Sequence, residues 1–140
     1  MSLPNAFEED LERSLYKHFA TYKGSYPLAL EGKHEVEASD KYVLRTDGPY
    51  IEESDGAVTV FAISINILIQ CSLPETNLYL DKDMLSAMRQ AFTTCISIKD
   101  SLGATISVAQ RLGGVTIRQF NRHENSLTYV TLEAEYEGQI

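Results

Sequence analysis

The sequence predicts an α+β fold: a mainly antiparallel sheet with a long β-hairpin and two helices packed on one side of it. Three observations predict this class. An amphipathic helical pattern opens the chain, a strict apolar alternation fills residues 61–71, and a second helical pattern from residue 84 precedes further strand-like segments. With 140 residues, the chain has the usual length of one domain, so we expect residues 1–140 to form a single domain.

The first element is a helix. Asn5 and Glu8 have the spacing of a capping box, and Gly24 is suited to end the helix. Apolar residues recur at intervals of four and three, which places them on one helical face: Phe7, Leu11, Leu15, Phe19 and Tyr22.

A β-hairpin is predicted next, after a weaker segment in which residues 26–30 suggest a short strand and residues 31–37 a loop or edge strand. Residues 42–45 form a strand that Asp47-Gly48-Pro49 interrupts. The chain continues through residues 50–54 to Asp55-Gly56, a pair typical of two-residue hairpin turns.

The returning strand gives the clearest pattern. Its apolar face consists of alternating residues: Phe61, Ile63, Ile65, Ile67, Ile69 and Cys71. A strand from Ala57 to Cys71 would be about 50 Å long at roughly 3.3 Å per residue. We therefore expect that it either bends or leaves the domain as an arm.

The second half repeats the order of helix and strands. Pro74 ends the sheet, and Asp81 is expected to cap a helix whose apolar face consists of Met84, Leu85, Met88, Ala91, Phe92 and Cys95. Strands are predicted over residues 104–112, 115–120 and 127–137, with a turn at Gly113-Gly114 and a loop over residues 121–125. The inward residues of the last strand are Val130, Leu132, Ala134 and Tyr136.

Charge and cysteine content exclude several classes. The formal charge is -8 and the basic residues are spread singly, which disfavours a nucleic-acid reader. Cys71 and Cys95 both fall in apolar patterns and are expected to be buried free thiols. We find no signal-peptide pattern and no apolar run suited to a membrane, so we expect a soluble cytoplasmic protein with no membrane partner.

No motif indicates catalysis. The histidines have no metal-ligand spacing, and His18 is expected at the edge of the core. There is no nucleophile elbow and no phosphate-binding loop. We therefore expect no enzyme, no metal and no cofactor. An enzyme whose residues meet only in space remains an alternative, with His123 and Glu124 or His34 and Glu35 as its candidates.

Surface apolar residues suggest instead an oligomer interface, formed by strand addition or arm exchange. These residues lie near the end of the hairpin and on the outward face of the last strand: Tyr50, Ile51, Val58, Val60 and Tyr129. The alternative is that they are ordinary scattered surface apolars. The carboxylates of Glu52, Glu53 and Asp55 are expected to be solvated at the hairpin end.

The layout resembles the tail terminator and tail-completion proteins of long-tailed bacteriophages, which join head to tail. The resemblance rests on Gly48-Pro49 before the hairpin, the strand from Ile63 to Ile69 with its Leu-Pro loop, and the closing strand from Leu127 to Thr131. It implies a ring, commonly of six copies, that caps the tail tube and meets tail-tube and head-completion proteins. It also implies assembly in the bacterial cytoplasm, a place in the virion, an acidic surface beside passing DNA, and no catalytic residues.

A second class of function fits the same pattern. A small α+β module that binds a partner or a ligand, as a monomer or a dimer, would show a concave apolar pocket between helix and sheet. The oligomeric state in solution distinguishes this class from the ring.

Overall fold

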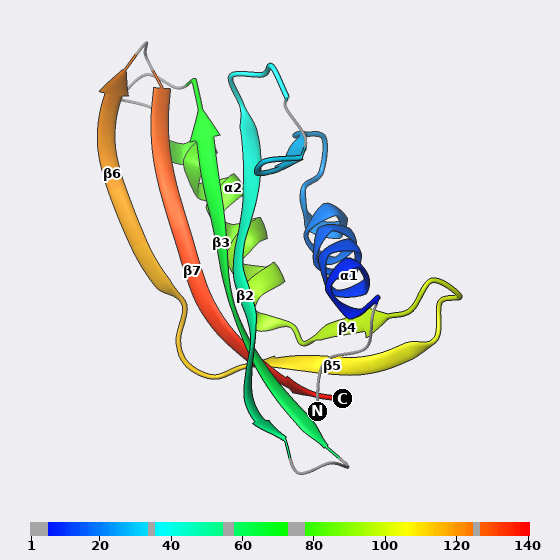
Figure 1. Cartoon of the computed structure of the whole chain (residues 1–140). Coiled ribbons are helices and arrows are strands. Elements are labelled where there is room, and N and C mark those ends of the chain that lie inside the picture. Colours follow the sequence, from blue (N-terminus) through cyan, green and yellow to red (C-terminus); the bar gives the residue numbers. More distant parts are fainter. Residues whose placement is uncertain (1–5, 34–35, 55–57, 73–77, 125–126) are drawn as a thin grey trace.

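In the computed structural model, two helices cover one face of a curled seven-stranded sheet (Figure 1). The structure describes residues 6–33, 36–54, 58–72, 78–124 and 127–140. The elements in chain order are α1 (Phe7–Tyr22), β1 (Leu28–Leu30), β2 (Lys41–Ser54), β3 (Thr59–Cys71), α2 (Leu78–Thr93), β4 (Ile96–Lys99), β5 (Thr105–Arg111), β6 (Thr116–Glu124) and β7 (Leu127–Gln139). The predicted α+β class with its long β2–β3 hairpin is confirmed.

The sheet is built around β7. Six strands follow one another in the order β1-β2-β3-β7-β5-β4, and β6 pairs with β7 as well. All pairs are antiparallel except β1 with β2, which are parallel. The last strand of the chain is therefore central, with β3 along one edge and both β5 and β6 along the other.

The turn predicted at Gly113-Gly114 does not reverse the chain. Arg111 of β5 pairs with Tyr136, and Thr116 of β6 pairs with Glu133, so both strands lie in the same direction along one edge of β7. The glycines lie in the connection between β5, which pairs first with β4 and then with β7, and β6, and the chain bends there (Figure 1).

The core lies between the helices and the concave face of the sheet. The alternating row of β3 from Phe61 to Cys71 is buried, as predicted, and so are the four inward residues predicted for β7. The helix α1 contributes Phe7, Leu11, Leu15 and Phe19. Phe19 of α1 meets Phe92 of α2 edge-on, with ring centroids 5.1 Å apart.

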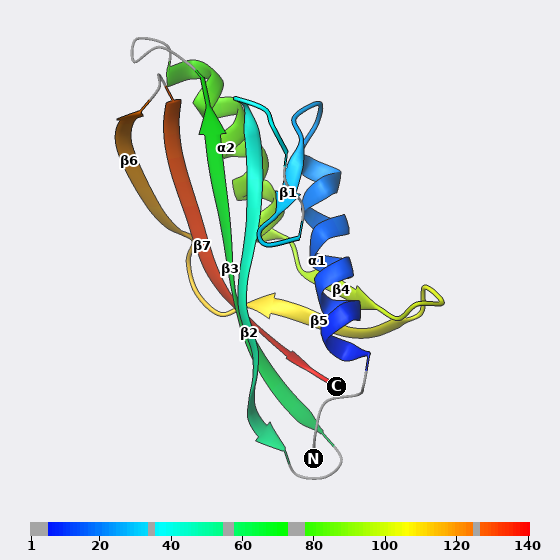
Figure 2. The same cartoon turned by 45° about the horizontal axis from the view of Figure 1, so that its top comes forward.

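The hairpin twists strongly along its length, so that its outer end crosses below the rest of the sheet (Figure 2). The predicted interruption at Asp47-Gly48-Pro49 is a register irregularity inside one 14-residue strand. Gly48 has φ 118°, and a Cβ there would lie 3.0 Å from the carbonyl oxygen of Ala62, so glycine is needed for the irregularity. The predicted turn at Asp55-Gly56 lies outside the described residues.

Three predictions about the helices are wrong. The N-cap of α1 is Ala6, with no side-chain cap bond, and Asn5 lies outside the described residues. The helix α2 begins at Leu78, so Asp81 lies within it and is not its cap. The same helix ends at Thr93, which leaves Cys95 exposed before β4, whereas Cys71 is buried as expected.

Candidate functional site: a hairpin tip and a basic groove

The outer end of the hairpin exposes apolar side chains. We call its described residues, 50–54 and 58, the hairpin tip. Tyr50 is 58% exposed, Ile51 44% and Val58 38%. Since their neighbours Thr59 and Phe61 are buried, the change from core to solvent occurs within a few residues. Three of the five residues that the sequence suggests for an interface are thus exposed, although Tyr50 and Ile51 are consecutive on β2 and their side chains point to opposite faces of the hairpin.

The base of this tip is held in place. Thr59 exchanges two backbone hydrogen bonds with Ile140, at 2.9 and 3.2 Å. The ring of Phe61 meets that of Phe7 edge-on with centroids 5.0 Å apart, which joins the start of β3 to α1. The exposed residues therefore extend from a fixed base.

The two other suggested interface residues lie elsewhere. Val60 is half-buried and pairs with Gln139 on β7, just inside the tip. Tyr129, also half-buried, pairs with Gln70 at the opposite end of the sheet. The structure does not bring Tyr129 near the tip.

Tyr50 is oriented by a local hydrogen bond. Its hydroxyl donates to Oδ1 of Asp47, and this bond to a carboxylate raises the pKa of the Tyr50 hydroxyl. The Tyr50 hydroxyl is thus paired within the chain, while the residue as a whole remains exposed.

A second surface feature is a groove of about 610 Å³ between α1 and the β4–β5 region. We call it the basic groove, because its lining includes three cationic side chains and one carboxylate: Arg13, Lys17, Lys99 and Asp100. His18, Cys95 and Ser97 also line it. This sign is opposite to that of the chain as a whole, whose formal charge is -8.

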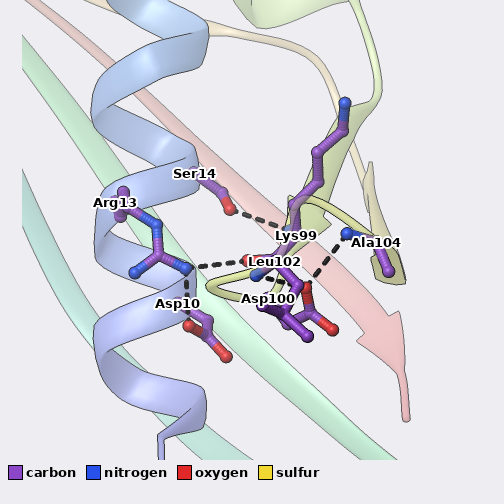
Figure 3. A network of polar contacts seen from close by, with 7 residues as sticks. All are labelled: Asp10, Arg13, Ser14, Lys99, Asp100, Leu102 and Ala104. Carbon is purple, nitrogen blue, oxygen red and sulfur yellow. Dashed lines mark hydrogen bonds and ion pairs between the residues drawn. The ribbon is translucent and has the colours of Figure 1, made fainter.

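The wall of the groove is fixed by polar contacts between α1 and the end of β4 (Figure 3). Arg13 Nη2 lies 2.6 Å from Asp10 Oδ1 and also donates to the backbone carbonyl of Lys99 at 3.2 Å. Ser14 Oγ accepts from the backbone N–H of Lys99 at 2.9 Å. The helix α1 thereby provides hydrogen-bond partners for the backbone N–H and carbonyl of Lys99, which lie at the outer edge of β4.

The rim of the groove is the turn that joins β4 to β5. Oδ1 of Asp100 accepts from the backbone N–H groups of Leu102 and Ala104, at 2.9 and 3.0 Å. These bonds are typical of an aspartate-stabilised turn. The turn holds Leu102 at 92% exposure, the most exposed large apolar side chain of the described residues.

The cations of the groove differ in their availability. Arg13 is engaged by Asp10 and Lys99. Neither Lys17 nor Lys99 has an ion pair with any described residue, and both side chains are exposed. His18 lies with Nε2 2.8 Å from the carbonyl oxygen of Ala91, at the boundary between the two helices. The two lysines are thus the cations that face solvent from the groove.

The two pairs that the sequence suggests for catalysis are not described by the structure. His34 and Glu35 lie outside the described residues, and so do the side chains of His123 and Glu124 on β6. No group of three or more potential metal ligands occurs in the described part of the chain.

Sequence reasoning missed this groove. Arg13 and Lys17 are four residues apart and share a helical face, which could have been noticed. Lys99 lies 86 residues beyond Arg13, and no local pattern reveals that contact.

The comparisons leave the family open. No protein-family model matches the chain, and no curated protein matches it either. Among the described residues, no helix is both long enough and apolar enough to cross a membrane.

Proposed function

We propose that this chain is a non-enzymatic structural assembly protein that joins copies of itself through the hairpin tip. The observation that carries the proposal is that Tyr50, Ile51 and Val58 are each exposed near the outer end of a hairpin whose base is held by backbone hydrogen bonds. Exposed apolar side chains lose water-exposed area when a partner covers them.

The form of assembly follows from the resemblance to phage tail terminators. We propose a closed ring, commonly of six copies in that family, at the end of a phage or prophage tail tube. Its partners would be tail-tube and head-completion proteins, in the bacterial cytoplasm during assembly and afterwards in the virion. The acidic charge supports this proposal, because a negative surface lets DNA pass without binding it.

The first test is the molar mass in solution, measured by light scattering across a concentration series. A discrete species of several copies, near six, is the expected result. A chain that stays monomeric at every concentration would overturn the proposal, and the basic groove would then become a candidate site for a small ligand.

A substitution test isolates the tip. We expect the triple variant Tyr50→Ser, Ile51→Thr, Val58→Thr to fold. It should need at least about a hundredfold higher concentration to assemble, because it loses three apolar side chains that the interface would bury. The matched control is Val108→Thr with Leu112→Ser, since these residues are 41% and 54% exposed but lie outside the tip. Normal assembly of the tip variant would exclude the tip as the interface.

A further inference from the structure

The outer edge of β4 borders the basic groove. β4 is the last strand in the order β1-β2-β3-β7-β5-β4, so a neighbouring strand pairs with only one of its two edges. The other edge is closed at its end by α1, because the backbone N–H and carbonyl of Lys99 are bonded to Ser14 and Arg13 (Figure 3). Ser97, two residues earlier, lines the groove with an exposed side chain. Because alternate residues of a strand direct their backbone groups to the same edge, those of Ser97 also point away from β5.

The pairing of β5 gives the same direction for Ser97. The N–H of Leu112 donates to the carbonyl of Glu135, so Leu112 directs its backbone groups toward β7. In steps of two residues back along β5, Val108 does the same and faces away from β4. Val108 is the register partner of Ser97, so this pair exchanges no backbone hydrogen bond. No other described residue bonds the backbone of Ser97, whose N–H and carbonyl therefore remain available to a partner.

The charge beside this edge is positive. Lys17 on α1 and Lys99 on β4 line the same groove, both side chains are exposed, and neither forms an ion pair with a described residue. The side chain of Lys99 extends away from the contacts that hold its backbone (Figure 3). Lysines at an open edge oppose pairing with the same edge of a second copy, because like charges would meet. They favour a strand that carries carboxylates.

We propose that the basic groove binds an extended acidic segment of a partner protein, which adds to the edge of β4 as a further strand. The N–H of Ser97 donates to the segment's backbone, and the carbonyl of Ser97 accepts from it. Lys99 on the adjacent strand and Lys17 on the helix meet the segment's carboxylates. In strand addition of this kind, backbone hydrogen bonds provide affinity and side chains provide specificity.

The groove is suited to this role because its walls are already in place. Its volume of about 610 Å³ falls in the range of sites that hold a ligand, roughly 300–1,000 Å³. Arg13 is held by Asp10 and by the carbonyl of Lys99, so binding does not have to order this part of the wall. The inference does not rest on the proposed function, since no residue of the hairpin tip lines the groove.

Amide exchange measured by NMR tests the open edge directly. In the free protein, the amide of Ser97 should exchange quickly, while those of Ile96 and Ile98, which face β5, should be protected. The acidic peptide Ac-Glu-Thr-Glu-Thr-Glu-Thr-NH2, added up to about 1 mM, should slow exchange at Ser97 by at least about tenfold. A Ser97 amide that is already protected without peptide, or that the peptide leaves unprotected, would overturn the inference.

Matched peptides separate charge from backbone pairing. Replacing every glutamate of the peptide by lysine should weaken binding, measured by fluorescence anisotropy, by at least about tenfold. Methylating every backbone nitrogen keeps the charges but removes the donors, and should also weaken binding by about tenfold. Equal binding of either peptide would contradict the proposed occupant. Equal binding of a short oligothymidylate would assign the groove to nucleic-acid phosphates instead.

A pair of charge variants tests the lysines. We expect Lys17→Ala with Lys99→Ala to weaken binding of the acidic peptide by about tenfold, because the two cations nearest the open edge are lost. The control, Lys23→Ala with Arg89→Ala, removes the same charge outside the groove and should bind as the native chain does. Equal losses in the two variants would show that only the net charge matters and would overturn the inference.

A backbone variant tests the edge itself. Proline at a strand edge is tolerated where the missing N–H would face outward, so Ser97→Pro should fold and bind the acidic peptide at least about tenfold more weakly. Native affinity of a folded Ser97→Pro would contradict strand addition. If circular dichroism shows that this variant is unfolded, the methylated peptide decides. Light scattering of the lysine variant should show the native assembly, which keeps failure of this inference distinct from failure of the proposed function.

Discussion

At the scale of single residues, burial changes the chemistry of two tyrosines. Tyr42 is 1% exposed, and burial raises the pKa of its hydroxyl to about 12. Tyr136 is fully buried, and burial likewise raises the pKa of its hydroxyl, which donates to the carbonyl oxygen of Phe92 at 2.7 Å. Both groups remain protonated in the folded chain at pH values where an exposed tyrosine ionises.

This difference predicts a loss of stability at high pH. Above the ordinary tyrosine pKa of 10.0, the unfolded chain releases the Tyr42 proton while the folded chain keeps it until about pH 12. The contribution of Tyr42 to the free energy of unfolding should therefore be constant well below pH 10 and fall by about 2 kcal/mol between pH 10 and 12, and Tyr136 should add to the fall in the same direction. Urea titrations at several pH values measure the slope. Tyr42→Phe should show a smaller slope, and an unchanged slope would contradict the assignment.

At the scale of elements, the close contact between β7 and β3 is set by one glycine. A Cβ at Gly138 would lie 2.5 Å from Cζ of Phe61, a ring that is fully buried against Phe7. We expect Gly138→Ala to lower the free energy of unfolding by about 1–3 kcal/mol, because the ring must move within a filled core. Gly114→Ala is the control, since nothing lies within 4 Å of its Cβ position. Equal effects of the two substitutions in urea unfolding would contradict this account.

The elements that the sequence predicts well are those with a long repeating pattern. The alternation of β3 over 13 residues and the apolar face of α1 over 16 residues each determine one buried side. β4 was missed because its four residues are too few to show alternation, and Cys95 continues the helical spacing of Met88, Ala91 and Phe92. The start of α2 at Leu78 was missed because Asp81 has the chemistry of a cap but lies one turn inside the helix.

One part of the candidate site could be predicted from the sequence, and the other could not. Exposure of Tyr50, Ile51 and Val58 follows from their place beside a hairpin turn, which local sequence indicates. The basic groove depends on the contact between α1 and β4, and the packing of the whole core determines that contact. Arg13, Lys17 and Lys99 are far apart in the sequence or isolated within it, yet they line one groove. The composition of the chain does not predict this cluster.

At the scale of the whole molecule, the end of β7 supports the hairpin tip. Removing residues 138–140 would remove the backbone partners of Thr59, Val60 and Phe61. We expect faster amide exchange at these three residues and weaker assembly, with the rest of the sheet unchanged. Hydrogen exchange with mass detection and light scattering measure both. Gln139→Ala keeps every backbone hydrogen bond and should behave as the native chain. Normal assembly of the truncated chain would show that the end of β7 is not needed for the tip to mediate assembly.

The central place of β7 also affects how the molecule forms during synthesis. The apolar row of β3 emerges early, but the strand that covers its open edge is the last of the seven described strands to be translated. Until then, an unpaired strand with one fully apolar face is available to other nascent chains. Pairing of such distant segments is slow because a long loop must first close. Until β7 is translated, the open edge of β3 is therefore the part of the growing sheet most exposed to pairing with a second copy of the chain.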